Sequence, residues 1–236
     1  MSTPETLIHY DSRVLHDIIQ WDVPTWKSAL FFWDRHFPDV RGRRVLDIGA
    51  RDGGLSLYFA LRGCRVLCSD VHGPTEKAKE LHARYNVSSR VEYAALDGCN
   101  LPLSDSLFDI VTFKSMLGAL GAYDNYEAQK RAVSEMFRVL RPGGSILFAE
   151  NMRGSPFHNR LRKHLTTWGN RWRYLTRSEV DELFSSASEL NVLYSGVLGV
   201  LGRNNSQKQL LSLVDTLVRP ITPRSCRYMV YGYASK

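Results

Sequence analysis

The stretch VLDIGARDGG, residues 45–54, decides the fold class of this 236-residue chain. Its apolar, β-branched start predicts a buried strand, and the glycines that follow predict a tight turn into a helix near 55–61. Gly49 and Gly53 allow backbone to approach a ligand without a Cβ in the way, and the helix offers its free N–H groups to a negative group. Arg51 stands where such turns usually carry their middle glycine. Its guanidinium either points into solvent or pairs with a carboxylate of the ligand.

Short apolar runs alternate with helical patterns up to about residue 150, which is typical of βαβ units in a parallel sheet. Helical stripes predict helices at 74–86 and 124–140, and Asp124 with Glu127 is expected to cap the second of them. Thr176 and Glu179 form another capping box before a later helix. The expected strands are 44–48, 65–69, 91–96, 109–113 and 145–149, followed by strand-like runs at 191–194 and 227–233.

Acidic residues follow the second and third expected strands. Asp70 lies about 20 residues beyond the glycine turn, where a carboxylate can accept hydrogen bonds from ribose hydroxyls. Asp97 and Gly98 follow the third strand, and a carboxylate there can accept a hydrogen bond from an exocyclic amine. Because parallel sheets bind ligands outside the carboxyl ends of their strands, Gly49, Asp70 and Asp97 predict one nucleotide-like site.

Four motifs carry a family resemblance: VLDIGARDGG, VLCSDV, YAALDGCNLPLSDSLFDIV and VLRPGGSILFAE. In this order they resemble the motifs of class I S-adenosylmethionine-dependent methyltransferases of the small-molecule type, closely over residues 43–151 and loosely beyond. The resemblance implies an α/β fold, a seven-stranded, mostly parallel Rossmann-like sheet with helices on both faces and a small helical cap.

The same resemblance implies S-adenosylmethionine as the cofactor. Asp47 and Gly49 would hold its methionine end, Asp70 its ribose and Asp97 its adenine amine, with Leu101 near the adenine. The full set of expected cofactor-binding residues is Asp47, Gly49, Arg51, Gly53, Asp70, Val71, Asp97 and Gly98.

Other enzyme classes fit the motifs less well. A nicotinamide site requires Gly-x-Gly-x-x-Gly, and Gly49, Arg51 and Gly54 do not fit it because Arg51 stands at the position of the middle glycine. FKSMLGAL, residues 113–120, contains neither the Asn-Pro-Pro-Tyr nor the Asp-Pro-Pro-Tyr of amide and nucleobase amino methylation. The chain also has no Pro-Cys pair, which argues against the cysteine nucleophile used to methylate cytosine carbon.

The net charge of +7 is concentrated in one segment. From Asn151 to Ser178 there is no acidic residue, and the basic residues there are Arg153, Arg160, Arg162, Lys163, Arg171, Arg173 and Arg177. Such a patch attracts an anionic partner. We therefore expect O-methylation of a small anionic or carbohydrate-like acceptor, with His158 as the candidate catalytic base and His164 as the second choice.

Two alternatives stay open at this point. Trp168, Trp172 and Tyr174 lie among the basic residues, where they could stack bases, so an enzyme that modifies RNA is one alternative. A catalytically silent binding module that keeps only the fold is the other. Failure to bind the cofactor would favour the silent module.

The chain is expected to be a single methyltransferase domain, 1–236. Within it we expect an N-terminal helical segment at 1–40, a cofactor-binding core at 43–151 and a basic substrate-cap segment at 152–178. The four cysteines have no paired spacing, so no metal site is expected. No leader-like start and no run of about 18 apolar residues occurs, which predicts a cytoplasmic protein without a membrane span.

Overall fold

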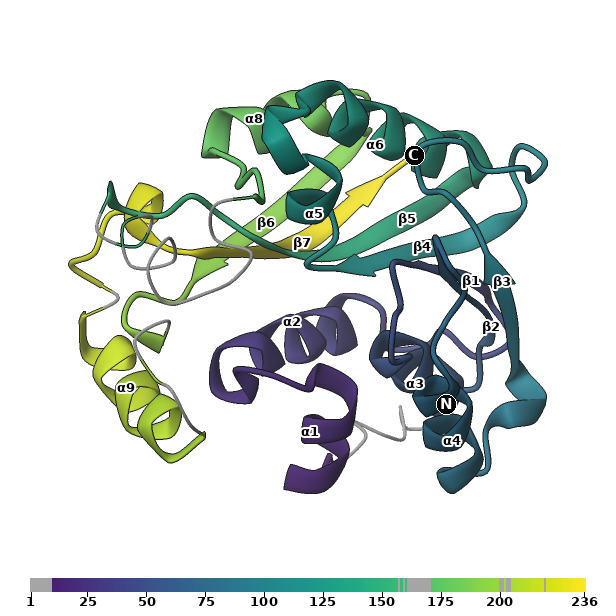
Figure 1. Ribbon diagram of the computed structural model, residues 1–236, viewed down its shortest axis with the longest axis horizontal. Coiled ribbons are helices and arrows are strands. Elements are labelled where there is room, and N and C mark those ends of the chain that lie inside the picture. The colour runs from purple at the N-terminus through teal and green to yellow at the C-terminus, as the bar shows by residue number, and fades with distance from the viewer. Residues whose placement is uncertain are drawn as a thin grey trace, which may run out of the picture.

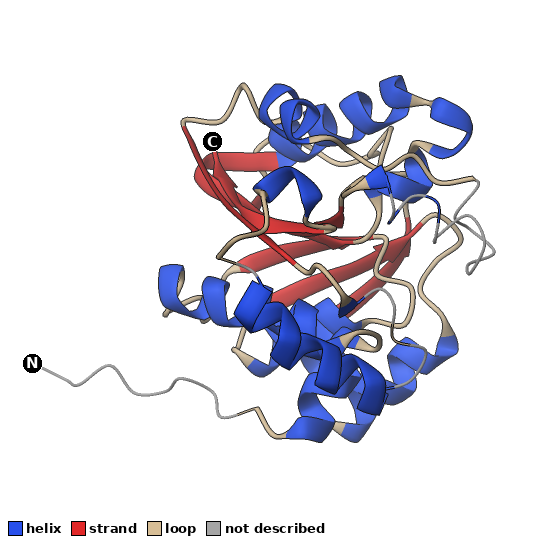
Figure 2. Ribbon diagram, turned by 90° about the vertical axis from the view of Figure 1, so that its left-hand side faces the viewer, coloured by secondary structure: helices blue, strands red, loops and turns tan. Residues whose placement is uncertain are grey.

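The computed structural model describes residues 10–156, 158, 160, 171–199, 202, 205–218 and 220–236. In this part of the chain a seven-stranded sheet separates two layers of helices (Figures 1 and 2). The strands are β1 Arg44–Ile48, β2 Arg65–Asp70, β3 Val91–Ala95, β4 Phe108–Lys114, β5 Leu140–Asn151, β6 Glu189–Ser195 and β7 Met229–Ser235. The α-helices are α1 Ser12–Ile19, α2 Val23–His36, α3 Gly54–Leu61, α4 Glu76–Arg84, α5 Leu117–Leu120, α6 Tyr126–Val139, α8 Arg177–Leu183 and α9 Asn205–Val218. The short 3-10 helices are η1 Ser88–Arg90, η2 Ala122–Asp124 and η4 Arg224–Cys226.

The strand order is β3-β2-β1-β4-β5-β7-β6. β1 pairs in parallel with β2 and β4, whereas β7 runs antiparallel to both β5 and β6. The expected α/β fold with a mostly parallel seven-stranded sheet is therefore confirmed. The chain moves outward from β1 to β3 and then crosses to β4 on the other side of β1. This reversal places a ligand crevice at the carboxyl ends of β1 and β4.

Both faces of the sheet are covered, which explains why the strands read as continuous apolar runs. On one face, α1, α2 and α3 bury an aromatic-rich core that includes Trp26 and Trp33. On the other face, α6 and α8 pack Met136 and Phe184 against the sheet. Figure 1 shows α6 and α8 on the side opposite α1, α2 and α3, as the expectation of helices on both faces requires.

One expected cap is confirmed and one is wrong. Thr176 and Glu179 form the capping box of α8. At α6, however, the N-cap is Asn125, whose side chain accepts from the Ala128 N–H at 3.1 Å. Asp124 ends η2 instead, with φ +62°, and its carboxylate accepts from Arg173 at 3.0 Å. A long-range ion pair therefore replaces the local cap at Asp124.

Candidate cofactor and acceptor site

The turn between β1 and α3 depends on two glycines with left-handed backbone. Gly49 has φ +69° and Gly53 has φ +75°. A Cβ on Gly49 would lie 2.9 Å from Met116 Cγ, and one on Gly53 would lie 2.8 Å from His82 Nε2. Both positions therefore require glycine for backbone conformation and for close approach.

Arg51 adopts the same left-handed region, with φ +45°, and its side chain is exposed. Its N–H donates to Asp70 Oδ2 at 3.1 Å, and its carbonyl accepts from the Thr75 N–H at 3.0 Å. The turn thus keeps a compact conformation despite the missing glycine, with the guanidinium directed to solvent. The hydrogen bond also links the turn to the acidic residue that ends β2.

Asp70 and Asp97 lie at neighbouring strand ends. The Leu96 N–H donates to the Asp70 carbonyl at 2.9 Å, which continues the β2–β3 pairing up to Asp97. Asp97 is exposed, and its Oδ1 accepts from the Cys99 N–H at 2.9 Å. A Cβ on Gly98 would lie 3.1 Å from Ile48 Cγ2, at the end of β1. The sheet therefore brings the predicted residues of β1, β2 and β3 together at the carboxyl ends of these strands. Val71, just after β2, is 56% exposed there.

A buried carboxylate and a lysine lie beneath this edge. Asp47 is 1% exposed and accepts from Ser56 Oγ at 2.7 Å. Burial raises the pKa of Asp47 to about 7, and the charge of Lys114 acts in the opposite direction. Burial also lowers the pKa of Lys114, at the end of β4, to about 8. The effect of the Lys114 charge on Asp47 is seen only in the tertiary structure.

The N-terminal segment closes against the glycine turn through the end of α1. A Cβ on Gly54 would lie 2.0 Å from the Ile18 carbonyl oxygen, so the first residue of α3 must be glycine for α1 to pack there. Lys114 Nζ donates to the carbonyl of Ile19 at 2.6 Å. Further along the N-terminal segment, Tyr10 hydrogen-bonds Asp34 at 3.4 Å, and Arg13 and His16 are exposed. The contact with the site therefore comes from backbone at 18–19.

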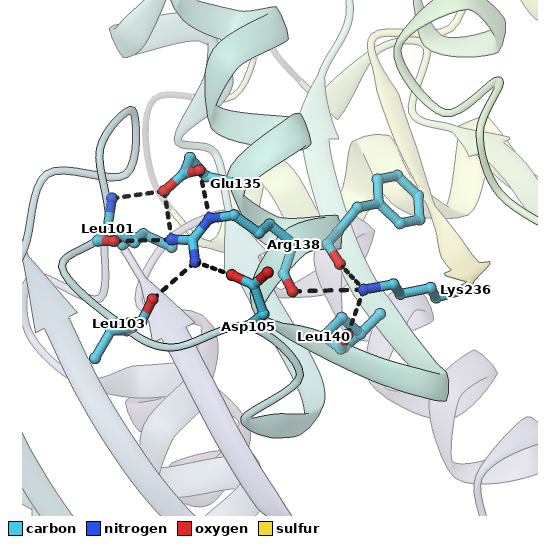
Figure 3. A network of polar contacts seen from close by, with 8 residues as sticks. Leu101, Leu103, Asp105, Glu135, Arg138, Leu140 and Lys236 are labelled. Carbon is cyan, nitrogen blue, oxygen red and sulfur yellow. Dashed lines mark hydrogen bonds and ion pairs between the residues drawn. The ribbon is translucent and has the colours of Figure 1, made fainter.

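The loop after β3 is held by an arginine clamp (Figure 3). Arg138 donates to the carbonyls of Leu101 and Leu103 at 2.8 Å each, and pairs with Asp105 and Glu135. Glu135 Oε2 accepts from the Leu101 N–H at 2.8 Å. Leu101 is only 3% exposed, so this expected adenine neighbour packs mainly into the core. The clamp orders the backbone that follows Asp97.

Two buried groups that support the site were not singled out from the sequence. Glu150, at the end of β5, is fully buried and accepts from the N–H groups of Leu117 and Asn151 at 2.7 Å each. Burial raises its pKa to about 7. An acidic residue that ends an apolar strand run, as in ILFAE, is the signal that could have found it.

The second group is His82 on α4. Its Nε2 donates to the Gly53 carbonyl at 2.9 Å, and its Nδ1 accepts from the Tyr93 hydroxyl at 2.8 Å. Burial lowers the pKa of His82, so the ring is neutral and can serve both partners. Because Gly53 and His82 lie on different elements, no local pattern indicates the pair.

His158 is 4% exposed, and both ring nitrogens have partners. Its Nδ1 accepts from the Ser155 N–H at 3.0 Å, and its Nε2 donates to the carbonyl of Val197. To act as a base, His158 would have to release one of these partners. Its catalytic role stays a prediction, and His164 lies outside the described residues.

The basic segment is only partly available to a ligand. Arg173 donates to Gln129 at 2.9 Å and pairs with Asp124 and Glu179, which fixes the segment to α6 and α8. Arg153, Arg160, Arg171 and Arg177 are exposed. Arg162, Lys163 and most of the expected helical cap lie outside the described residues. Arg173 thus has a structural role that its place in a charge run did not indicate.

Comparisons with known proteins agree with this geometry. A family described as methyltransferase domain matches residues 46–148. The demethylmenaquinone methyltransferase of Clavibacter sepedonicus is 33% identical over 126 residues, which are 53% of this chain and 46% of that protein. The ubiquinone/menaquinone biosynthesis C-methyltransferase UbiE of Cronobacter sakazakii is 30% identical over 114 residues, 47% of this chain and 43% of that protein. The chain therefore spans less than half the length of both relatives.

Among solved structures, phosphoethanolamine N-methyltransferase 2 of Haemonchus contortus in complex with S-adenosyl-L-methionine has the same fold. Its TM-score is 0.62 at 18% identity, over 89% of this chain and 52% of that one. The matched core, the strand order and the acidic residues at three neighbouring strand ends agree with one another. Residues 46–148 therefore match a methyltransferase-domain family, and the chain shares the fold of that solved S-adenosylmethionine-bound methyltransferase.

Proposed function

We propose that this chain transfers a methyl group from S-adenosylmethionine to a small-molecule acceptor. The observation that carries the proposal is the convergence of Asp47 with Gly49, Asp70, and Asp97 with Gly98 at the ends of β1, β2 and β3. Asp47 would accept from the amino-acid end of the cofactor, Asp70 from its ribose and Asp97 from its adenine. The left-handed turn at 49–53 lets this ligand approach the backbone.

The cofactor supplies an electrophilic methyl group on a sulfonium. This chain's residues would hold an acceptor in line with that methyl group, at about 3 to 3.5 Å, because positioning and exclusion of water supply much of the rate of such transfers. The side chain of Met116 lies close to both Gly49 and Gly98. A Cβ on Gly49 would lie 2.9 Å from Met116 Cγ, and one on Gly98 would lie 3.9 Å from Met116 Sδ. Met116 therefore bounds the space between β1 and β4.

For the acceptor we propose an ionisable ring that is methylated at carbon. The printed names of both sequence relatives support this choice, since each denotes a quinone methyltransferase. Attack by the ring carbon would form a carbon–carbon bond as the methyl–sulfur bond breaks, which would leave the thioether S-adenosylhomocysteine, and the ring would then give the proton of the methylated carbon to solvent. An ionised ring hydroxyl makes that carbon nucleophilic. Lys114, at the end of β4, would supply a positive charge that favours the ionised hydroxyl.

The other acceptors have less support. O-methylation of an anionic or carbohydrate-like acceptor was expected from the basic segment, yet Arg173 there is held by Gln129, Asp124 and Glu179. RNA stacking was expected from Trp168, Trp172 and Tyr174, but Tyr174 is 9% exposed and Trp168 lies outside the described residues.

Calorimetric titration with S-adenosylmethionine and S-adenosylhomocysteine tests cofactor binding. Asp70→Ala and Asp97→Ala should each lose about 1 to 3 kcal/mol of binding free energy, because each removes a hydrogen bond to a polar group. Glu92→Ala, at an exposed position on β3, is the matched control. Unchanged affinity in both site variants would refute the assignment. A lack of binding by the wild type would favour the silent binding module.

The acceptor is tested separately, with a labelled methyl group and two probes. One probe is a naphthohydroquinone, and the other is a carbohydrate carboxylate. A product with the label on ring carbon supports the proposal. A product with the label only on oxygen overturns carbon methylation while it leaves the methyltransferase activity intact.

A further inference from the structure

Ser115 directly follows β4 and has a left-handed backbone, with φ +55°. In this conformation the Cβ of an L-residue crowds the following carbonyl oxygen, a contact that glycine avoids. The Ser115 N–H nevertheless donates to the Ala149 carbonyl at 2.8 Å, so the pairing of β4 with β5 continues to this residue. Strained residues that the surrounding structure holds in place are typical of functional sites.

The side chain of Ser115 is held by Asn151, the last residue of β5. Asn151 is 6% exposed, and its Nδ2 donates to Ser115 Oγ at 2.6 Å. Buried Glu150 fixes the backbone on both sides of this contact, because it accepts from the N–H groups of Asn151 and Leu117. The hydroxyl oxygen of Ser115 is therefore fixed in position by groups that are themselves buried and bonded.

The hydroxyl proton of Ser115 has a different environment from its oxygen. A serine hydroxyl offers one proton to donate and two lone pairs that accept. The Asn151 amide occupies a lone pair, and within the part of the chain that the structure describes no carbonyl or side chain accepts the proton. Ser115 is half-buried, so a ligand at the strand ends can reach it. Ser115 is thus a positioned donor whose proton is available to a ligand.

The neighbours of Ser115 border the proposed acceptor space. The Met116 side chain lies close to Gly49 and Gly98, and Lys114 ends β4 on the other side of Ser115. Strand β4 lies between β1 and β5 in the sheet (Figure 1). A ring held beside the cofactor at the ends of β1 and β4 would therefore meet the Ser115 hydroxyl.

We propose that Ser115 donates a hydrogen bond to the hydroxyl oxygen of the acceptor ring, and that Asn151 is the positioning residue that keeps the Ser115 proton directed toward it. This inference rests on the proposed function, methylation of an ionisable ring at carbon. An O–H donor favours the ionised form of the ring hydroxyl, because hydrogen bonds to an anion are roughly twice as strong as neutral ones. The donor is already fixed, so it needs little reorganisation as the ring ionises. Ser115 would thereby select rings that carry a hydroxyl group.

Two ring ligands that differ in one group test this inference on the full chain loaded with S-adenosylhomocysteine. One is a hydroxynaphthoquinone, which is ionised at neutral pH, and the other is the methylnaphthoquinone with a methyl group at the same position. Among the described residues no helix is long and apolar enough to cross a bilayer. Neither ring has a long apolar tail, so calorimetry in plain buffer measures both affinities. We expect the wild type to prefer the hydroxyl ring by about tenfold or more, as a hydrogen bond to a charged group provides.

Three variants show whether this preference comes from the Ser115 proton. Ser115→Ala should reduce the preference by about tenfold and leave the affinity for the methyl ring unchanged, whereas a merely structural role would weaken both rings alike. Ser115→Gly removes the same hydroxyl but relieves the left-handed strain, so it should lose the preference without loss of stability. Asn151→Asp keeps the size of the side chain but accepts the Ser115 proton, so it should also lose the preference.

Ser145→Ala is the matched control for the loss of a serine hydroxyl. Ser145 lies on the same strand, and its hydroxyl contacts Ser235 Oγ at 3.1 Å, at the opposite end of β5 from Asn151. This variant should keep the wild-type preference. Urea unfolding and calorimetry with S-adenosylhomocysteine show which variants stay folded and still bind the cofactor product.

Equal binding of the two rings by the wild type, or binding of neither, overturns the inference. A folded Ser115→Gly variant that keeps the wild-type preference overturns it as well. The labelled-methyl experiment then separates this failure from failure of the proposed function. Carbon methylation of the naphthohydroquinone at the wild-type rate by Ser115→Gly rejects the Ser115 contact alone. Label only on oxygen in the wild-type product rejects the acceptor, and this inference with it.

Discussion

The ammonium of Lys114 donates a 2.6 Å hydrogen bond to the carbonyl oxygen of Ile19. This contact ties the end of β4 to the end of α1, across 95 residues of sequence. The same lysine lowers the pKa of Asp47, which burial raises to about 7. Lys114 thus couples the N-terminal segment to the charge state of the buried carboxyl group below the glycine turn.

Replacing Lys114 by Met should weaken cofactor binding and shift its pH dependence. Loss of the charge raises the pKa of Asp47 further. If ionised Asp47 binds the amino group of the cofactor, binding is lost as pH falls through that pKa. We expect about tenfold weaker binding, in line with the roughly 1.5 to 3 kcal/mol of a hydrogen bond to a charged group, and a half-loss at higher pH than in wild type. Calorimetry from pH 6 to 9 measures both, with exposed Lys79→Met as control. If half of the binding is lost at the same pH as in the wild type, the charge of Lys114 does not affect the pKa of Asp47.

Glu150→Gln should reveal the buried carboxyl group in the pH dependence of stability. Burial raises the folded-state pKa of Glu150 from 4.5 to about 7. A raised pKa stabilises the folded state below about pH 4.5, and this contribution is lost as pH rises through about 7. The unfolding free energy of wild type minus that of Glu150→Gln should therefore fall between about pH 4.5 and 7. Urea denaturation measures it, with Glu92→Gln as the exposed control. A difference that rises with pH would mean that the two N–H donors outweigh burial.

Arg51→Gly should stabilise the fold. A left-handed conformation costs an L-residue roughly 1 to 2 kcal/mol, which glycine avoids. Glycine also makes the unfolded chain more flexible, and this lowers the gain in stability by roughly 0.5 to 1 kcal/mol. We expect a net gain of roughly 0.5 to 1 kcal/mol in urea unfolding. Arg51→Ala keeps the left-handed strain without the guanidinium, so it should show no gain. Equal effects of both variants would assign the change to the side chain rather than to the backbone.

Gly53→Ala should destabilise the fold more than Gly42→Ala, whose glycine has a similar left-handed backbone but no neighbouring atoms. The new Cβ would lie 2.8 Å from His82 Nε2 and 2.9 Å from Ala78 Cβ. We expect a loss of roughly 2 to 4 kcal/mol, the sum of left-handed strain and overpacking. Gly42→Ala has φ +76° and no atom within 4 Å, so it isolates the backbone cost of roughly 1 to 2 kcal/mol. Thermal and urea unfolding measure both losses of stability. Equal losses for Gly53→Ala and Gly42→Ala would show that α4 shifts to make room for the new Cβ.

Local patterns in the sequence predicted the order of the elements and the strand ends of the cofactor edge. The bounds of β1, 44–48, are those expected, whereas β2 extends one residue beyond the expected 65–69 and includes Asp70. Strands and their turns are short-range features, since apolar runs, glycines and caps act within a few residues. The same range limit explains the wrong cap at Asp124, whose carboxylate is taken by Arg173, 49 residues away.

Tertiary structure decided which of these groups have partners. Sequence determined that a carboxylate would stand at Asp47. It did not determine that Lys114 would reach Ile19, that His82 would bind Gly53, or that Asp215 would bind the backbone at 197–198. Each of these contacts joins elements distant in the chain, and the free energy of a buried charge depends on the atoms that packing places around it. Only the assembled sheet and its helices supply those atoms.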